Sequence, residues 1–417
     1  MHKEKERLVI KNFGPIKSVD LKLGKMTILI GEQATGKSTI AKVLAVCRYF
    51  SYIANNEFIS NPTSNSFIQG LESWGIDGFI QIDSYIRYEC IDYELEIKNK
   101  TENVAISVNE DKTINYSDIT LFSPSLIPIS DNFKVLLLNL QSTISDIKAK
   151  ESNDRLIGHF FLKIPSDFYQ NQVSEVMNNP FYIPTERGLQ SIFSLGKSSI
   201  QNISDSLFNQ FAKMDMFARG FKNETEIKPL NILYKNVNGQ GFIKNVRQIE
   251  FSSLYNGASG YQSIIPVVLA VKYYSENKRK KKTFIIEEPE LNLFPKAQKK
   301  LMEFFVENIN LNHHSFLLPT HSPYILSTLG NLIYADKIGN LDSKKYSEEV
   351  KKSIPEKYWL NINDVSVYYL DKGQAKNLVN IEDCLINLDD LDNVSEIVNK
   401  EFDELLNLEV QFENSDL

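Results

Sequence analysis

The amino-acid sequence predicts an α/β fold with an antiparallel β layer and a helical insertion. An apolar segment at 26–30 runs into a glycine-containing loop and then a helix from 37 to about 50. Strand-like runs separated by turn formers between 78 and 116 indicate an antiparallel layer beside the main sheet. Strands and helices alternate again from 259 to 318, an order typical of a sheet covered by helices.

These elements divide the chain into four parts, which we expect to form one head. The helical part shows no apolar heptad pattern over three or four repeats, so we expect no long coiled coil. Asn238-Gly239 between two strand-like runs indicates a β-hairpin. The parts are an N-terminal half with the antiparallel strands (1–130), the helical insertion (131–230), a second half (231–340) and an acidic α/β extension (341–417).

Composition excludes several classes of protein. The chain of 417 residues has a formal charge of −7, and residues 341–417 carry 18 Asp/Glu against 8 Lys/Arg, so no broad phosphate-binding surface is indicated. Three widely spaced cysteines, Cys47, Cys90 and Cys384, indicate neither a disulfide framework nor a zinc site. No apolar run reaches the roughly 18 residues of a membrane helix, so we expect a cytoplasmic protein that does not enter the membrane.

A phosphate-binding loop is the most specific motif. Residues 31–38, GEQATGKS, match GxxxxGK[ST] and lie between an apolar strand and a helix. Backbone N–H groups of such a loop surround phosphate oxygens, the lysine reaches the β- and γ-phosphates, and the serine hydroxyl binds Mg²⁺. We therefore expect ATP and Mg²⁺ as ligands. The residues assigned to the nucleotide are Gly31, Glu32, Gln33, Ala34, Thr35, Gly36, Lys37, Ser38 and Thr39, with Ser38 also on the metal.

Two carboxylates follow a second apolar strand, in the segment FIIEEPE at 284–290. At the carboxyl edge of a sheet they would lie beside the phosphate loop, so we assign Glu287 to the metal and Glu288 to the attacking water. An ordinary acidic turn is the alternative interpretation. His321, after the next strand, is assigned to the γ-phosphate or the water, although a lone histidine is more often structural.

A second helix N-terminus is suited to an anion. The segment NGASGYQ at 256–262 precedes a helix, with Ser259 as the expected N-cap and Gly260 open to close approach by another molecule. A plain helix cap is the alternative. Its position shortly before the two carboxylates favours a nucleotide-binding role for Ser259 and Gly260.

The order of these motifs resembles the ABC-type ATPases, in the soluble branch of RecF, the SMC proteins and the overcoming-lysogenisation-defect nucleases. The opening NFGPIK at 12–17 and the acidic motif EEPE at 287–290 are similar to that branch. YIPTERG at 182–188 and the segment 392–403 are similar to compact AAA-type ATPases of bacterial defence cassettes.

The resemblance implies an ATPase whose nucleotide lies between the phosphate loop of one copy and Ser259 and Gly260 of another, in a head-to-tail homodimer or higher homo-oligomer. It also implies a sensor or scaffold in an antiphage defence system, which controls a separate effector nuclease. The alternative is a RecF- or SMC-like clamp for DNA repair or chromosome handling. An energy-coupling subunit of a transporter fits the motifs poorly.

Several positions depart from the family pattern or stay open. Glu287 stands where aspartate is usual, and Asn292 and Phe294 stand where the family often has histidines. Gln81 and Gln141 are both candidates for the glutamine that joins Mg²⁺ to the β subdomain. Arg187 can serve the nucleotide, the dimer interface or a structural ion pair. The basic run 278–282 is expected to be a solvated connecting loop rather than a DNA-binding site.

Overall fold

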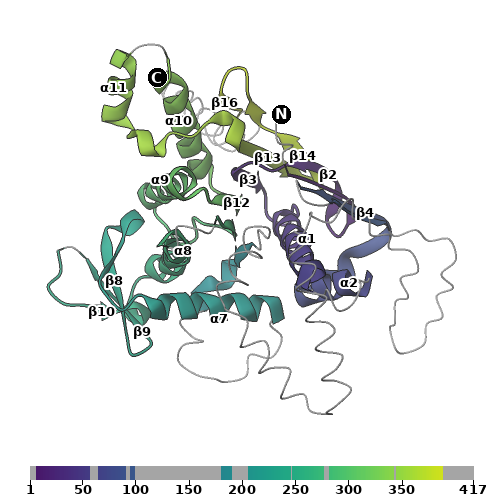
Figure 1. The fold of residues 1–417 in the computed structure, drawn as a ribbon, viewed down its shortest axis with the longest axis horizontal. Helices are drawn as coiled ribbons and strands as arrows, with labels where there is room; N and C mark the ends of the chain where they lie inside the picture. The colour runs from purple at the N-terminus through teal and green to yellow at the C-terminus, as the bar shows by residue number, and fades with distance from the viewer. Residues whose placement is uncertain are drawn as a thin grey trace, which may run out of the picture.

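The computed structural model describes residues 6–56, 64–90, 94–98, 180–189, 205–245, 247–276, 281–341 and 344–387. A large mixed sheet forms the centre, with helices on both faces (Figure 1). The helices are α1 (Lys37–Asn56), α2 (Ser64–Ser73), α7 (Asp205–Gly220), α8 (Ser259–Glu276), α9 (Pro295–Asn312), α10 (Pro323–Gly339) and α11 (Lys344–Ser353).

Ten strands form the large sheet, in the order β5-β4-β1-β2-β14-β13-β3-β12-β11-β6. Their bounds are β1 (Arg7–Phe13), β2 (Ile16–Lys22), β3 (Met26–Gly31), β4 (Ile80–Glu89), β5 (Glu94–Lys98), β6 (Phe181–Ile183), β11 (Thr283–Ile286), β12 (Ser315–Thr320), β13 (Val365–Asp371) and β14 (Gln374–Asn377). Two strands, β15 (Val379–Asn380) and β16 (Leu385–Ile386), form a small separate ladder.

Five neighbouring strands, β13, β3, β12, β11 and β6, run parallel. The α/β fold expected from the alternating pattern is therefore confirmed. The antiparallel strands β1, β2, β4 and β5 are also present, but they extend the same sheet instead of stacking beside it. The join is narrow, because β14 and β2 pair in parallel with one registered residue pair, Gln374 with Ser18.

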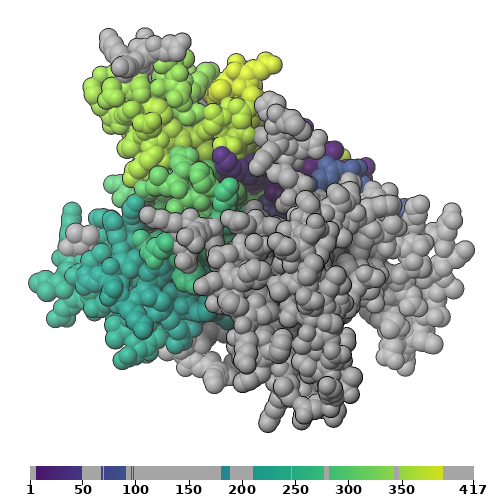
Figure 2. Space-filling model, viewed as in Figure 1, coloured from purple at the N-terminus to yellow at the C-terminus, as the bar shows by residue number. Residues whose placement is uncertain are grey.

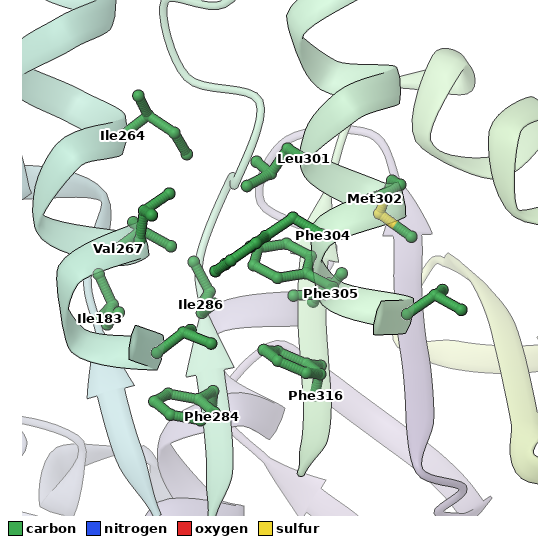
Figure 3. Packing of buried hydrophobic residues seen from close by; sticks show 14 of the residues in the cluster. Ile183, Ile264, Val267, Phe284, Ile286, Leu301, Met302, Phe304, Phe305 and Phe316 are labelled. Atoms are coloured by element: carbon green, nitrogen blue, oxygen red, sulfur yellow. The ribbon is translucent and has the colours of Figure 1, made fainter. Parts of the chain in front are cut away.

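Alternating side chains of the parallel strands build two cores, one on each face of the sheet. In β11, Phe284 and Ile286 face α8 and α9, whereas Ile285 faces the side covered by α1. Figure 3 shows the first core, where Phe284 and Phe316 stack with ring centroids 5.3 Å apart. A strand buried on both faces reads as a continuous apolar run, which explains why the runs ending at 30 and 286 are so apolar.

Residues 341–417, predicted as an acidic α/β extension, contribute two strands to the large sheet, β13 and β14. Val365–Asp371 (β13) pairs in parallel with β3 at the centre of the sheet. Its mixed sequence VSVYYLD has four consecutive buried residues, and two of them, Ser366 and Tyr368, are not aliphatic, so its period is not distinctive. Most of the helical insertion at 131–230 and the segment 392–403 lie outside the described residues.

The expected hairpin is confirmed. Strands β8 (Ile232–Val237) and β9 (Gln240–Asn245) pair across Asn238 and Gly239, both with positive φ (51° and 86°), as a type I′ turn requires. They join β7 (Thr225–Ile227) and β10 (Ser252–Ser253) in a four-stranded sheet. In Figure 2 the teal residues that include this sheet form a surface distinct from the yellow-green C-terminal elements.

Among the helices that the structure describes, none is both long and apolar enough to cross a membrane. Cys47, Cys90 and Cys384 all lie in the described residues and form no disulfide there, and Cys47 is fully buried, which raises the pKa of its thiol. In the basic run 278–282 only the last two residues are described. Lys281 is exposed, and the ammonium of Lys282 lies 4.9 Å from the ring centroid of Tyr274.

A buried histidine joins α8, α9 and β11 through side-chain hydrogen bonds. Nδ1 of His314 accepts from the backbone N–H of Lys282 at 3.2 Å, and Nε2 lies 3.2 Å from the hydroxyl of Ser275. That hydroxyl is 2.6 Å from the side-chain oxygen of Asn308. Burial, with Lys282 and His313 nearby, lowers the pKa of His314 to about 4. The ring is therefore neutral in the folded protein at pH 7.

We expect stability to fall with acid between pH 6.5 and 4 through this residue. Unfolding restores the ordinary pKa of 6.5, so the unfolded chain binds more protons in this window and the free energy of unfolding falls by roughly 3 kcal/mol as it is crossed. Denaturant titrations from pH 4.5 to 7 should show a shallower pH slope in His314→Asn. His313→Asn is the control, because His313 is exposed and its φ of 55° suits asparagine. Equal slopes in all three proteins would contradict the assignment.

Candidate functional site

The candidate site lies where four neighbouring parallel strands end. Strands β3, β12, β11 and β6 are consecutive in the sheet and point the same way, so their carboxyl ends share one edge. The segments that leave this edge are the phosphate loop after β3, residues 320–322 after β12, residues 287–290 after β11 and residues 184–187 after β6. The topology thus brings together motifs that are up to 291 residues apart in the chain.

The phosphate loop is closed over the amine of Lys37. Its Nζ donates to the carbonyl of Gly31 at 2.8 Å and to that of Glu32 at 2.6 Å. Burial lowers the pKa of Lys37 to about 8, against the opposing attraction of Glu288 and Glu290. The lysine and these two carboxylates therefore lie close enough to interact electrostatically, although Glu290 was not among the residues predicted for the site.

Backbone geometry explains the glycines of the loop. A Cβ atom on Gly31 would lie 2.3 Å from the carbonyl oxygen of Leu370 in β13, and Gly36 has a φ of 99° that favours glycine. Ala34 also adopts a positive φ, 61°. The side chains of Glu32, Gln33 and Ser38 are exposed, whereas Thr39 is buried.

The paired acids Glu287 and Glu288 have different surroundings. Glu287 is buried, and its carboxylate accepts from the Tyr182 hydroxyl at 2.6 Å and from the Thr185 hydroxyl and N–H at 3.1 and 3.3 Å. Glu288 is about one-third exposed and lies 3.7 Å from His321, measured from Oε1 to Nε2. Its φ of 42° is uncommon for a side chain of this size.

Glu290 is a third carboxylate of the site. Its Oε1 accepts from the hydroxyl of Thr320 and from the N–H of His321, both at 2.8 Å. Its Oε2 is buried and has no hydrogen-bond partner. The bond to His321 fixes the backbone of that residue, so its ring projects from an anchored position toward Glu288.

Arg187 is fully buried behind the acids, and within the described part of the chain its guanidinium donates only to backbone carbonyls. The acceptors are Glu287 at 2.7 Å, Glu288 at 2.6 Å, Pro184 at 3.1 Å and, on α8, Ser263 at 3.0 Å. Burial lowers the pKa of Arg187 to about 10, so it stays charged at neutral pH. This geometry describes a structural role for Arg187. Its partners are backbone carbonyls, and not the carboxylate that a structural ion pair would have.

The second helix N-terminus is built by α8. The carbonyl of Ala258 accepts from the N–H groups of Tyr261 at 2.9 Å and Gln262 at 3.3 Å, so Ala258 occupies the N-cap and Ser259 the first helical position. The prediction of Ser259 as the N-cap was therefore wrong by one residue. A Cβ on Gly260 would lie 2.7 Å from the carbonyl oxygen of Asn292. This close approach within the same chain accounts for a glycine at this position.

The remaining motif positions add little to the site. Phe294 is 79% exposed, and Asn292 has a φ of 59°. The side-chain amide of Gln81 donates to the carbonyl of Gly14 at 3.4 Å, and Gln141 lies outside the described residues. Neither observation selects one glutamine for the metal.

The donor set at this edge fits Mg²⁺ held by few protein ligands. No cluster of three metal-binding side chains occurs within the described ranges. Mg²⁺ in phosphate-transfer sites, however, is held by one or two carboxylates together with substrate phosphates and water. Ser38 offers an exposed hydroxyl, and the carboxylate of Glu287 has about four lone-pair sites, of which the three donors from Tyr182 and Thr185 leave one.

Sequence reasoning missed several residues that hold the acids in place. Tyr182 and Thr185 bind Glu287. Glu290 accepts from the backbone of His321 and from the hydroxyl of Thr320. A signal was present in the sequence. Tyr182 lies within strand β6, Thr320 ends strand β12, and Thr185 and Glu290 lie shortly after strands β6 and β11. Within YIPTERG, only Arg187 has a candidate role in the sequence analysis.

Residues 76–326, more than half of the chain, match the model of the family described as "AAA ATPase domain". The chain belongs to this family. The matched residues of this AAA ATPase include Arg187, the acid pair and His321, and the phosphate loop precedes them. No curated protein matches this chain in sequence.

Among solved structures, similar ones include SMC head domains. The SMC head domain from Thermotoga maritima has 10% identity and a TM-score of 0.38, covering 89% of this chain and 97% of that chain. An SmcHead bound to the C-winged helix domain of ScpA has 10% identity and a TM-score of 0.38, covering 90% and 97%. An Smc head domain with an extended coiled coil, bound to the C-terminal domain of ScpA derived from Pyrococcus furiosus, has 10% identity and a TM-score of 0.34, covering 94% and 98%. Similarity at this level does not extend to activity, ligands or partners.

Proposed function

We propose that the protein is a cytoplasmic ABC-type ATPase that binds and hydrolyses Mg-ATP. The observation that carries the proposal is the convergence of Lys37, Glu288 and His321 at one sheet edge. Glu288 contributes to the electrostatic environment of Lys37, and it lies 3.7 Å from the ring of His321. A phosphate-binding lysine, a carboxylate and a histidine in this arrangement suit in-line attack of water on a terminal phosphate.

Each residue has a defined task in this proposal. The N–H groups of residues 31–39 and the ammonium of Lys37 hold the β- and γ-phosphates. Glu288 orients and polarises the attacking water, and His321 donates a hydrogen bond to the γ-phosphate or that water. Ser38 and Glu287 would hold Mg²⁺, which would offset the negative charge of the phosphates.

We further propose that the site is completed by a second copy, arranged head to tail. Ser259 lies at the first helical position of α8, where unpaired backbone N–H groups favour an anion. Placed over a neighbour's phosphate loop, Ser259 and Gly260 would enclose the triphosphate, and two equal sites would form in a two-fold dimer. ATP binding would then close the dimer, and hydrolysis would open it.

Mixing two inactive variants tests both parts of this proposal. Lys37→Ala disables the phosphate loop, and Ser259→Glu disables the second helix end. A mixed head-to-tail dimer keeps one site with both elements intact, so phosphate release should recover to about one quarter of the parent rate after random exchange of subunits. Each variant alone should be nearly inactive. No recovery on mixing would contradict the shared site, and an inactive parent would contradict the ATPase itself.

For the cellular role, we propose a sensor or scaffold in a bacterial antiphage defence system, which controls a separate effector nuclease. Support comes from the similarity of residues 182–188 to ATPases of defence cassettes, because Tyr182, Thr185 and Arg187 of that segment surround the acids here. Phage challenge of cells that carry the gene with its neighbours should show protection, which Glu288→Gln removes. ATP turnover stimulated by duplex DNA, without such protection, would favour the alternative of a DNA-handling clamp.

A further inference from the structure

The acid proposed to act on water has an unusual backbone conformation. Glu288 has a φ of 42°, in the left-handed region where a glutamate costs about 1 to 3 kcal/mol unless its surroundings hold it. Three hydrogen bonds hold it here. Its N–H donates to the carbonyl of Pro319 in β12 at 2.8 Å. Its own carbonyl accepts from Arg187 at 2.6 Å and from the N–H of Leu291 at 2.9 Å.

Arg187 also binds the carbonyl that precedes this residue. Its Nη1 donates to Glu287 at 2.7 Å and its Nη2 to Glu288, so one planar group fixes the carbonyls on both sides of the strained position. Because the guanidinium is planar and its N–H groups point in fixed directions, it defines the relative orientation of the two peptide planes. An ammonium group has no comparable geometry.

The same guanidinium contacts the helix that carries Ser259. Its Nε donates to the carbonyl of Ser263 at 3.0 Å, one turn into α8. A carbonyl in that turn would normally accept within the helix from four residues later, at 267. Arg187 is therefore a direct contact between α8 and the turn that contains Glu288.

We propose that Arg187 is a positioning residue, which fixes the backbone of Glu288 and links it to α8, so that movement of Ser259 reaches the acid. This inference rests on the proposed ATPase function. Arg187 itself does not contact the nucleotide, since its donors are directed to backbone carbonyls behind the acids.

Steady-state kinetics of Arg187→Lys tests the proposal. Lysine keeps the positive charge but lacks the planar set of N–H donors in fixed directions. We therefore expect kcat for ATP to fall about 100-fold, the loss that misplacement of a reacting group by about 1 Å can cause. Binding of ATP, measured by titration calorimetry, should stay within about threefold, because the phosphate loop is untouched. Parent-like kcat in Arg187→Lys would overturn the proposal, as would an equal loss of ATP binding.

A matched control separates positioning from general damage. Arg48 on α1 is also a buried arginine, and it forms a bidentate ion pair with Glu6. Arg48→Lys should lower thermal stability while kcat per folded molecule remains at the parent level. An absence of ATP turnover in the parent would contradict the proposed ATPase function, whereas the outcomes given for Arg187→Lys concern the positioning role.

A second measurement leaves Arg187 in place, in case its variant does not fold. Hydrogen exchange of the parent should slow together in residues 259–266 and 286–294 when Mg²⁺ and a non-hydrolysable ATP analogue are added. In Ser259→Glu, which cannot engage a neighbour, the added protection of both segments should be lost together. Retained protection of 286–294 in that variant would overturn the link to α8.

Discussion

Glu288→Gln is expected to lower ATP turnover by about 10²- to 10⁴-fold, the range typical of loss of a positioned base. Glutamine preserves the shape of the side chain and removes the negative charge that polarises water. The backbone held by Pro319 and Arg187 should be unchanged, because those bonds involve main-chain atoms of residue 288. ATP should therefore remain bound, and the closed dimer should accumulate.

Two measurements check this result. Phosphate release gives the turnover, and sedimentation with and without ATP gives the dimer fraction. The matched control is Glu303→Gln on α9, where the carboxylate pairs with Lys299 at the surface and contributes little. Turnover in Glu288→Gln equal to that of the parent would remove this residue from the mechanism.

Lys37→Ala is expected to weaken ATP binding by about 10- to 100-fold, which corresponds to the loss of one or two charge-assisted hydrogen bonds to phosphate. The stability of the fold should fall much less than the affinity for ATP. Burial lowers the pKa of Lys37, which means that the folded state disfavours its charged form, and alanine removes that cost. The thermal midpoint should accordingly stay within a few degrees of the parent.

Fluorescent-nucleotide titration and thermal unfolding measure the two effects separately. Lys42→Ala, on the same helix and half-buried, is the control that should alter neither by much. A large loss of stability in Lys37→Ala with ATP affinity unchanged would mean that the amine serves only its bonds to Gly31 and Glu32.

The site was largely predictable because its parts obey local rules. A glycine loop between strand and helix, and acids directly after an apolar strand, need no knowledge of distant contacts. Topology then brings Glu288 toward Lys37, because parallel strands end at one edge. The hairpin at Asn238 was predictable for the same reason, since the turn needs two residues with positive φ.

The remaining features depended on contacts that local patterns do not encode. Arg187 has carbonyl partners up to 101 residues away, and no spacing rule connects an arginine to such acceptors. The contact of Gly260 with Asn292 is similar, because a glycine before a helix reads equally as a cap or as a docking point. Strand β13 is buried on both faces, but its sequence is not purely apolar. Its pattern therefore did not identify it as a central strand.

The position of β13 has a consequence for the order in which the protein can be built. Strand β3, which delivers the phosphate loop, gains its neighbour on one side only from residues 365–371, and Leu370 of that neighbour abuts Gly31. The ribosome must therefore synthesise most of the polypeptide before β3, which leads into the phosphate loop, has a neighbouring strand on both sides. Until then the nascent head exposes an open strand edge, and translation stalled upstream of this strand would leave a product prone to association instead of an ATPase.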